Sequence, residues 1–343
     1  MTQNRLKYLR AAIALLLTAC SSSQQRDLPP EQVKAERQVQ QELALGHAFN
    51  RYARVQDIAF PLLTLATERC GRRTRDVLGI ALHTADDYPK AQHDASQALF
   101  GPLDGVHIKH RFAGSHAATV LKDGDKLLSI NNTPVPDSSS LTSKRLSNLL
   151  EHAPSEPISL NINRRGEPLT VEVKPTRICN YPVLISGQDA VNAYADGSSI
   201  TLNAGLIRFA SKDEELALII AHELAHNIDD HGIDKLKGGI AGALVDVTIS
   251  AATGGISPGF AAVIGANIFS QQYEVEADQL AIQLLHQRGY KIDNLPEFWR
   301  RMATIHPSSI THDDHASHPT TVERYLIMRA EVDRLLKTNS TGD

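Results

Sequence analysis

The stretch Leu216-Ala217-Leu218-Ile219-Ile220-Ala221-His222-Glu223-Leu224-Ala225-His226 decides the fold of the C-terminal half of the chain. It follows Ser211-Lys212-Asp213-Glu214, a capping box, so we expect a helix over residues 212–229. Four residues turn a helix by about 400°, which places His222 and His226 on one face, where both can bind one Zn²⁺ ion. Glu223 lies beside them, in position to act as general base on a zinc-bound water. The alternative is two surface histidines beside a solvated glutamate.

A catalytic zinc site usually takes three protein ligands, so the third must come from another segment. Glu274-Val275-Glu276-Ala277-Asp278 lies in a stretch that we expect to be helical as far as Gly289. Because Glu274 and Asp278 share one helix face, we expect Glu274 to bind zinc and Asp278 to accept a hydrogen bond from the free nitrogen of His222. Glu276 points about 200° away and is the weaker candidate. An acidic solvated face is the alternative interpretation.

The two motifs, with the later Ser317-His318-Pro319-Thr320-Thr321-x-Glu323-Arg324, resemble the gluzincin zinc metallopeptidases of the HtpX and BepA type. The resemblance extends from Tyr181 to about Arg334. It implies an α+β fold, in which a mostly helical zincin-type metallopeptidase domain carries a small edge sheet. It also implies that Asn192 and Ala193, in the strand beside the metal, contact the substrate backbone.

A group of histidines lies near the C-terminus, at positions 306, 312, 315 and 318. His318 is a candidate for two roles, which the sequence leaves open. It can donate a hydrogen bond to the oxyanion that forms during peptide hydrolysis, or it can bind zinc as a fourth ligand and close the site. A histidine-rich surface loop without a role is the alternative.

The N-terminus has the features of an export signal. Arg5, Lys7 and Arg10 precede the apolar run AAIALLL, which is far shorter than the roughly 20 residues of a membrane-spanning helix. The following Leu17-Thr18-Ala19-Cys20 resembles a bacterial lipobox, which implies cleavage before Cys20 and its lipidation. Ser21 after the cysteine implies a lipid-anchored protein of the bacterial cell envelope, on the outer membrane and facing the periplasm. A soluble secreted protein is the alternative.

Export would place the other two cysteines in an oxidising compartment, where Cys70 and Cys179 can form a disulfide. Between them lies a separate module. The bridge would therefore join the points where the chain leaves for that module and returns from it. Two small buried hydrophobic side chains are the alternative interpretation.

Between Gly101 and Pro175 the sequence changes to short strand-like runs that are separated by Gly, Pro, Asn and Ser. We expect one helix over residues 141–152 and four short strands, over residues 106–112, 126–130, 158–163 and 169–173. The turn Leu121-Lys122-Asp123-Gly124-Asp125 and the final hairpin around Arg165-Gly166 resemble a PDZ domain. The resemblance implies that a C-terminal or extended peptide binds at the sheet edge. An unrelated β-rich insert is the alternative.

The chain therefore divides into a signal peptide (1–19), a tether with the start of an N-terminal helix (20–45), an N-terminal helical part of the peptidase domain (46–98), a PDZ-like domain (99–176) and the zinc metallopeptidase domain (177–343). Over residues 31–69 we expect one or two helices. Residues 238–269 are apolar but broken by Gly254-Gly255, so two buried helices are favoured over a hairpin that enters the membrane.

The charge balance excludes one class of partner. The formal net charge is −4, and removal of a leader that contains three basic residues would make it more negative. Nucleic acid is therefore not an expected partner, since binding to its phosphates needs clustered Lys and Arg.

The favoured function is that of a zinc metalloendopeptidase, a hydrolase with one Zn²⁺ per chain that cleaves misfolded or misassembled envelope polypeptides in protein quality control. Two other functions are a chaperone-like factor that binds through the PDZ-like domain and has a latent zinc site, and a structural lipoprotein. The presence of Glu223 favours the peptidase, because a structural zinc site needs no general base.

Overall fold

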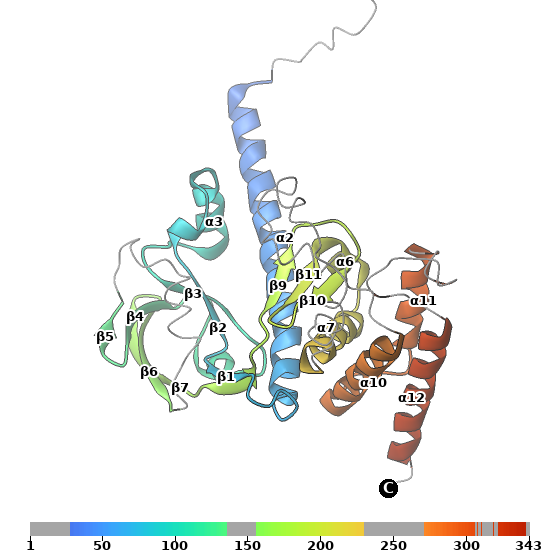
Figure 1. Cartoon of the computed structure of the whole chain (residues 1–343). Helices are drawn as coiled ribbons and strands as arrows, with labels where there is room; N and C mark the ends of the chain where they lie inside the picture. The colour runs from blue at the N-terminus through green and yellow to red at the C-terminus, as the bar shows by residue number, and fades with distance from the viewer. Residues whose placement is uncertain are drawn as a thin grey trace, which may run out of the picture.

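The computed structural model of the protein describes residues 28–135, 156–229, 271–305, 307, 310, 318 and 322–340. Their fold is α+β, as the sequence predicts (Figure 1). The helices are α2 (Pro30–Leu65), η1 (Ala85–Asp87), η2 (Lys90–Gln92), α3 (His93–Phe100), α4 (Ala117–Val120), α6 (Ala204–Phe209), α7 (Asp213–Ile228), α10 (Gln271–Arg288), α11 (Pro296–Ile305) and α12 (Val322–Ser340). The strands are β1 (Thr74–Val77), β2 (Ile80–His83), β3 (His107–Arg111), β4 (Lys126–Ile130), β5 (Thr133–Pro134), β6 (Ile158–Arg164), β7 (Glu167–Val173), β8 (Thr176–Cys179), β9 (Val183–Ser186), β10 (Ala193–Ala195) and β11 (Ile200–Asn203).

Several sequence predictions fall outside the described residues, among them Cys20 with its signal peptide, the helix at 141–152 and the apolar segment 238–269. Among the residues that are described, none of the helices combines the length and the apolar character that a membrane span requires.

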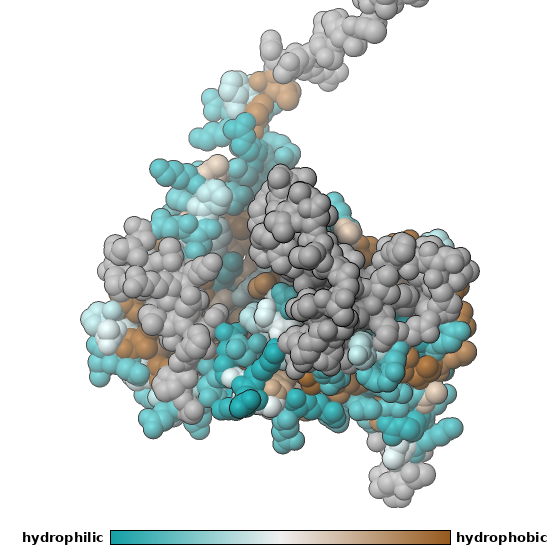
Figure 2. Space-filling view, in the orientation of Figure 1, coloured by the Kyte–Doolittle hydropathy of each residue, from teal (hydrophilic) through white to brown (hydrophobic). Residues whose placement is uncertain are grey.

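Helix α2 is a single helix of 36 residues, where the sequence left one or two open. Pro30 suits the first turn, because its missing N–H has no helical partner at that position. The N-terminal part of α2 projects from the body of the molecule and is mainly hydrophilic (Figures 1 and 2). The C-terminal part is buried, with Val55, Ala59 and Leu62 fully covered. This part of α2 therefore belongs to the hydrophobic core of the molecule.

An antiparallel sheet with the order β2-β3-β4-β6-β7 forms the β-rich unit, and β5 pairs with β4 beside this path. Strands β3, β4, β6 and β7 lie within two residues of the predicted strands. Strand β2 was not predicted, because four residues are too few for a clear alternation of apolar and polar side chains. The sheet therefore begins before residue 99, the predicted start of the PDZ-like domain.

The turn that precedes β4 is held by a buried charge. Gly124 has a φ of +89°, which glycine adopts without strain. Asp125 is buried and accepts a hydrogen bond from the Lys122 amide at 2.8 Å. Arg164 donates two further bonds to the Asp125 carboxylate, at 2.8 and 2.7 Å. The buried carboxylate is thus paired, as its burial requires.

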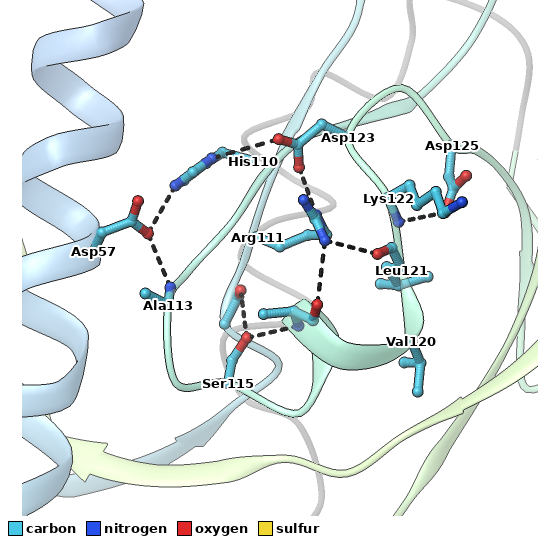
Figure 3. A network of polar contacts seen from close by, with 12 residues as sticks. Asp57, His110, Arg111, Ala113, Ser115, Val120, Leu121, Lys122, Asp123 and Asp125 are labelled. Atoms are coloured by element: carbon cyan, nitrogen blue, oxygen red, sulfur yellow. Dashed lines mark hydrogen bonds and ion pairs between the residues drawn. The ribbon is translucent and has the colours of Figure 1, made fainter.

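A histidine joins the β-rich unit to α2 (Figure 3). Asp57 of α2 accepts hydrogen bonds from His110 Nε2 and from the Ala113 amide, both at 2.9 Å. The Nδ1 atom of His110 lies 3.7 Å from Asp123 Oδ2. Burial lowers the pKa of His110, but Asp123 and Asp57 outweigh it and raise this pKa to about 9. A protonated imidazole between two carboxylates therefore fixes the sheet to the helix.

The disulfide lies where the chain leaves for the β-rich unit and returns from it. Strand β1 pairs with β8 from Thr74 opposite Cys179 to Val77 opposite Thr176. The structure contains the disulfide Cys70–Cys179, with a Cα–Cα distance of 5.7 Å. It closes a segment with a sequence separation of 109 residues, which reduces the entropy of the unfolded chain.

A second core surrounds α7. Helices α2 and α10 pack on α7, and α12 packs on α10. A three-stranded sheet with the order β10-β11-β9 lies against the same helix, with β9 parallel to β11. Helix α7 begins one residue later than the predicted capping box implies, because its N-cap is Lys212 and not Ser211. The glutamate that closes the box is therefore Glu215 and not Glu214, and it accepts a hydrogen bond from the Lys212 amide at 3.4 Å.

Candidate metal centre

Helix α7 carries the two histidines of the HExxH motif in its buried last turns. The exposed fractions of His222 and His226 are 1% and 2%. Their rings meet edge to face with centroids 4.6 Å apart, and their Nε2 atoms lie 3.1 Å from each other. The four-residue spacing therefore places the two Nε2 atoms next to each other, as the sequence predicts.

Helix α10 places Glu274 and Asp278 on the side that faces α7. Glu274 Oε2 lies 3.5 Å from His222 Nε2, and Glu274 Oε1 lies 3.5 Å from His226 Nε2. Asp278 Oδ1 lies 2.9 Å from Nδ1 of His222, the ring nitrogen that faces away from the cluster. Glu276 instead accepts a hydrogen bond from Gln272 on the exposed side of α10.

His318 completes the cluster. Its Nδ1 atom lies 3.0 Å from Glu274 Oε1 and 3.4 Å from His222 Nε2. Its Nε2 atom lies 3.6 Å from Glu223 Oε1. The histidines at 306, 312 and 315 lie outside the described residues. His318, one of the predicted group of histidines, thus contacts residues of both motifs.

The donor set fits zinc. Each of His222, His226, Glu274 and His318 offers one ligand atom, and these four atoms all lie within 4.8 Å of one another. Three imidazole nitrogens and one carboxylate oxygen are a set that zinc accepts. Zn–N bonds of about 2.0–2.1 Å in a tetrahedron imply about 3.3 Å between ligand atoms. The contacts of 3.0 to 3.5 Å between donor atoms bracket that value.

The protonation states of the ligands also suit a cation. Burial raises the pKa of Glu274, but His318 and Arg324 outweigh it and hold this pKa well below its usual range. Burial lowers the pKa of His226 well below its usual value. Burial lowers the pKa of His222 as well, but Asp278 and Glu274 outweigh it and raise that pKa to about 9. The carboxylate is thus ionised and His226 neutral, while a metal must displace a proton from His222.

Glu223 is the buried carboxylate that stands next to the cluster without being part of it. It is 2% exposed, and its Oε2 atom accepts no hydrogen bond within the described part of the chain. Burial raises the pKa of Glu223, against the opposing effect of His318 and His222. A higher pKa makes the carboxylate a stronger base toward the proton of a bound water.

Arg324 of α12 is a site residue that sequence reasoning quoted but gave no role. It is 1% exposed, and its Nε and Nη2 atoms each donate to Asp278 at 2.8 Å. Its Nη1 atom lies 2.7 Å from Glu274 Oε2. The guanidinium also stacks over Trp299, 4.5 Å from the ring centroid. Two buried carboxylates need a nearby cation. The predicted pair of Glu274 and Asp278 therefore already indicated that a basic residue such as Arg324 should lie beside them.

Ala193 is the first residue of β10, an outer strand of the small sheet that packs against α7, and Asn192 directly precedes it. Asn227, next to His226, ties this sheet to the site. Its Oδ1 atom accepts a bond from the Gly197 amide at 2.7 Å, and its Nδ2 atom donates to Ser199 O at 3.0 Å. The sequence did not indicate a role for Asn227, because a single asparagine forms neither a motif nor a periodic pattern.

We expect Glu274→Ala to lower the zinc content of the purified protein at least tenfold and Glu276→Ala to leave it unchanged. Loss of Glu274 removes a ligand atom from the centre of the cluster, whereas Glu276 bonds to Gln272 outside it. The measurement is metal analysis after dialysis, with circular dichroism to show that both variants fold. Equal metal loss in the two variants would mean that the wrong glutamate was assigned.

Comparison with known sequences agrees with this geometry. Residues 162–331 match the profile of peptidase family M48. This range contains all four residues of the cluster together with Glu223, Asp278 and Arg324.

Three relatives illustrate the match. The beta-barrel assembly-enhancing protease of Yersinia pestis is 26% identical over 157 residues, which are 41% of this chain and 32% of the relative. The protein of the same name from Escherichia coli K12 is 31% identical over 138 residues, 36% of this chain and 28% of the relative. The mitochondrial metalloendopeptidase OMA1 of Arabidopsis thaliana is 23% identical over 154 residues, 43% of this chain and 31% of the relative. The chain thus aligns with about a third of the length of these curated relatives.

Proposed function

Because residues 162–331 match the profile of peptidase family M48, we propose that the chain is a zinc-dependent endopeptidase. The observation that carries the proposal is Glu223, a buried carboxylate beside a cluster of three histidines and Glu274. A zinc site with a purely structural role needs no such group. The proposed ligands are His222, His226 and Glu274, one zinc ion per chain, with His318 as a further donor.

In the proposed reaction Glu223 takes a proton from the attacking water and passes it to the leaving nitrogen. Bound zinc would polarise the scissile carbonyl and make the water more acidic. Asp278 holds the ring of His222 in the orientation that directs Nε2 into the cluster. Arg324 helps to keep Glu274 ionised and holds both Glu274 and Asp278 in place. Asn192 and Ala193 at the outer strand β10 would receive the substrate backbone in extended form.

The substrates we propose are misfolded or misassembled polypeptides of the bacterial envelope. Two relatives are named for enhancing the assembly of β-barrels, which supports a role of this kind. An outer strand next to the centre also suits unfolded chains, because main-chain hydrogen bonds to a strand do not depend on one side chain.

The test is cleavage of casein by the mature chain together with its metal content. We expect about one zinc per chain, loss of cleavage with 1,10-phenanthroline and recovery on addition of zinc, because the water lacks its activating cation in the apoprotein. A zinc-loaded chain that leaves casein and other unfolded proteins intact would contradict the proposal. It would favour a chaperone-like factor with a latent zinc site.

We further propose that Cys20 carries the lipid anchor and holds the protein on the outer membrane, facing the periplasm. Cys20→Ala should move the protein from the membrane fraction to the soluble periplasm, because several acyl chains are needed for durable attachment. The measurement is fractionation followed by immunoblotting, with Ser21→Ala as the matched control. Sedimentation of the Cys20 variant with membranes would instead favour an attachment through residues 238–269.

Peptide binding at the β-rich unit is a second proposed activity, and one observation favours it. Strand β2 lies at the edge of its sheet in the described part of the chain, so one side of its backbone is open to a further strand. An extended or C-terminal peptide can add there, as at a PDZ domain. This activity could deliver polypeptides to the metal centre.

A further inference from the structure

The side chain of Asn227 joins the metal-binding helix to the turn between β10 and β11. Asn227 is 1% exposed and directly follows His226 in the last turn of α7. Its Oδ1 atom accepts a hydrogen bond from the Gly197 amide at 2.7 Å, and its Nδ2 atom donates one to Ser199 O at 3.0 Å. Both polar atoms of the carboxamide are therefore bonded to residues 196–199, which we call the β10–β11 turn.

The β10–β11 turn is held in one shape by its own hydrogen bonds. The Asp196 carboxylate accepts bonds from the amides of Ser198 and Ser199, at 2.8 and 2.6 Å. Burial raises the pKa of Asp196, but these bonds and those from the two hydroxyls outweigh it and lower this pKa, so the carboxylate is ionised. Directly beside the turn, Ala195 of β10 lies opposite Ile200 of β11. The position of the turn therefore sets the position of β10.

Strand β10 is where the proposed peptidase would hold its substrate, and the inference rests on that function. The strand is an outer one in its sheet within the described residues, and it packs against α7 (Figure 1). Hydrolysis needs the scissile carbonyl at a fixed distance from Glu223, which α7 carries. A shift of β10 relative to α7 would move the bound chain with it. A misplacement of about 1 Å can lower a rate about 10²-fold.

Two neighbouring hydrogen bonds join other parts of the molecule. The Tyr181 hydroxyl donates to Asn227 O at 2.9 Å and so satisfies one of the carbonyls that the end of a helix leaves without a helical partner. Tyr181 lies between β8 and β9, away from the turn in sequence. Arg73 Nη1 donates to Gly197 O on the exposed side of the turn, from the residue before β1. The Asn227 side chain differs from both, because it joins α7 itself to the β10–β11 turn.

We propose that Asn227 is a positioning residue, whose side chain fixes β10 relative to the metal centre and so places the scissile carbonyl of a bound chain. It is not one of the four clustered donors, so it acts through the turn and not as a ligand. A carboxamide suits this task because Gly197 requires an acceptor and Ser199 a donor. Without these two bonds the turn can shift relative to α7, while the pairing of β10 with β11 is kept.

The experiment compares Asn227→Ala with Tyr181→Phe in the zinc-loaded mature chain. Each substitution removes hydrogen bonding at the same residue of α7, but only Asn227→Ala releases the β10–β11 turn. The substrate is internally quenched fluorescent casein. We expect kcat of Asn227→Ala to fall about 10-fold to 100-fold, with KM changed less than about threefold, because β10 still binds the chain but misplaces its carbonyl. Tyr181→Phe should keep the kcat of the parent chain.

Amide hydrogen exchange measures the same link without catalysis. In Asn227→Ala the Gly197 amide loses its acceptor, so exchange over residues 193–199 should become at least about tenfold faster. The same segment should exchange at the parent rate in Tyr181→Phe. Zinc content should be equal in all three chains, since neither substitution removes a clustered donor.

An unchanged kcat in Asn227→Ala would overturn the proposal and assign the residue to stability alone. An equal loss of kcat in Tyr181→Phe would overturn it as well, because the cause would then be the end of α7 and not the turn. The same holds for a rise in KM without a fall in kcat, for loss of zinc from Asn227→Ala, and for unchanged exchange over residues 193–199. A parent chain that leaves casein intact would contradict the proposed function, whereas the exchange rates would still decide whether Asn227 holds β10.

Discussion

Glu223→Gln is expected to reduce casein cleavage at least 10²-fold, and up to about 10⁴-fold, while zinc content and stability stay the same. General base catalysis contributes a factor of this size, and the amide of glutamine cannot take up a proton at neutral pH. The substitution keeps the shape of a side chain that is 2% exposed, so the packing of α7 is preserved. Because Glu223 is not among the four clustered donors, the metal should remain.

The measurement compares initial rates at equal zinc occupancy. Glu214→Gln is a matched control, since it makes the same chemical change at the partly exposed start of α7. It should cleave at the rate of the parent chain. Normal turnover by Glu223→Gln would remove the proposed mechanism, and loss of zinc from it would assign Glu223 as a ligand.

His318→Ala is expected to raise the rate of casein cleavage about 10-fold to 100-fold. The Nδ1 atom of His318 lies as close to Glu274 and His222 as the other donor atoms lie to one another. As a fourth ligand it would leave no position for water in the resting enzyme. If the open form makes up about 1–10% of the population, removal of the imidazole raises activity by the inverse of that fraction.

The opposite result has a definite meaning. If His318 donates a hydrogen bond to the oxyanion through Nε2, its removal should lower the rate constant about 10²-fold to 10³-fold with little change in zinc content. The sign of the change therefore separates the two roles. An unchanged rate would show that the imidazole has neither. Zinc analysis of the same sample excludes metal loss as the cause of a lower rate.

The sequence by itself determined the parts of the site that one helix holds. His222 and His226 share a face of α7, and Glu274 and Asp278 share a face of α10, because residues four apart are neighbours on any helix. The longer strands of the β-rich unit were predicted because their alternation of apolar and polar residues spans enough of the chain to be recognised. The choice of Glu274 over Glu276 also rests on this local geometry.

Only the tertiary structure decided which segments meet. His318 reaches His222 across 96 residues of sequence, and Arg324 reaches Asp278 across 46. Strands β1, β2, β8 and β9 have four residues each, too few for a periodic signal, so their pairing depends on partners far along the chain. The contact of His110 with Asp57 arises only because the β-rich unit packs on α2. Such contacts are set by the packing of the whole chain, which no local spacing encodes.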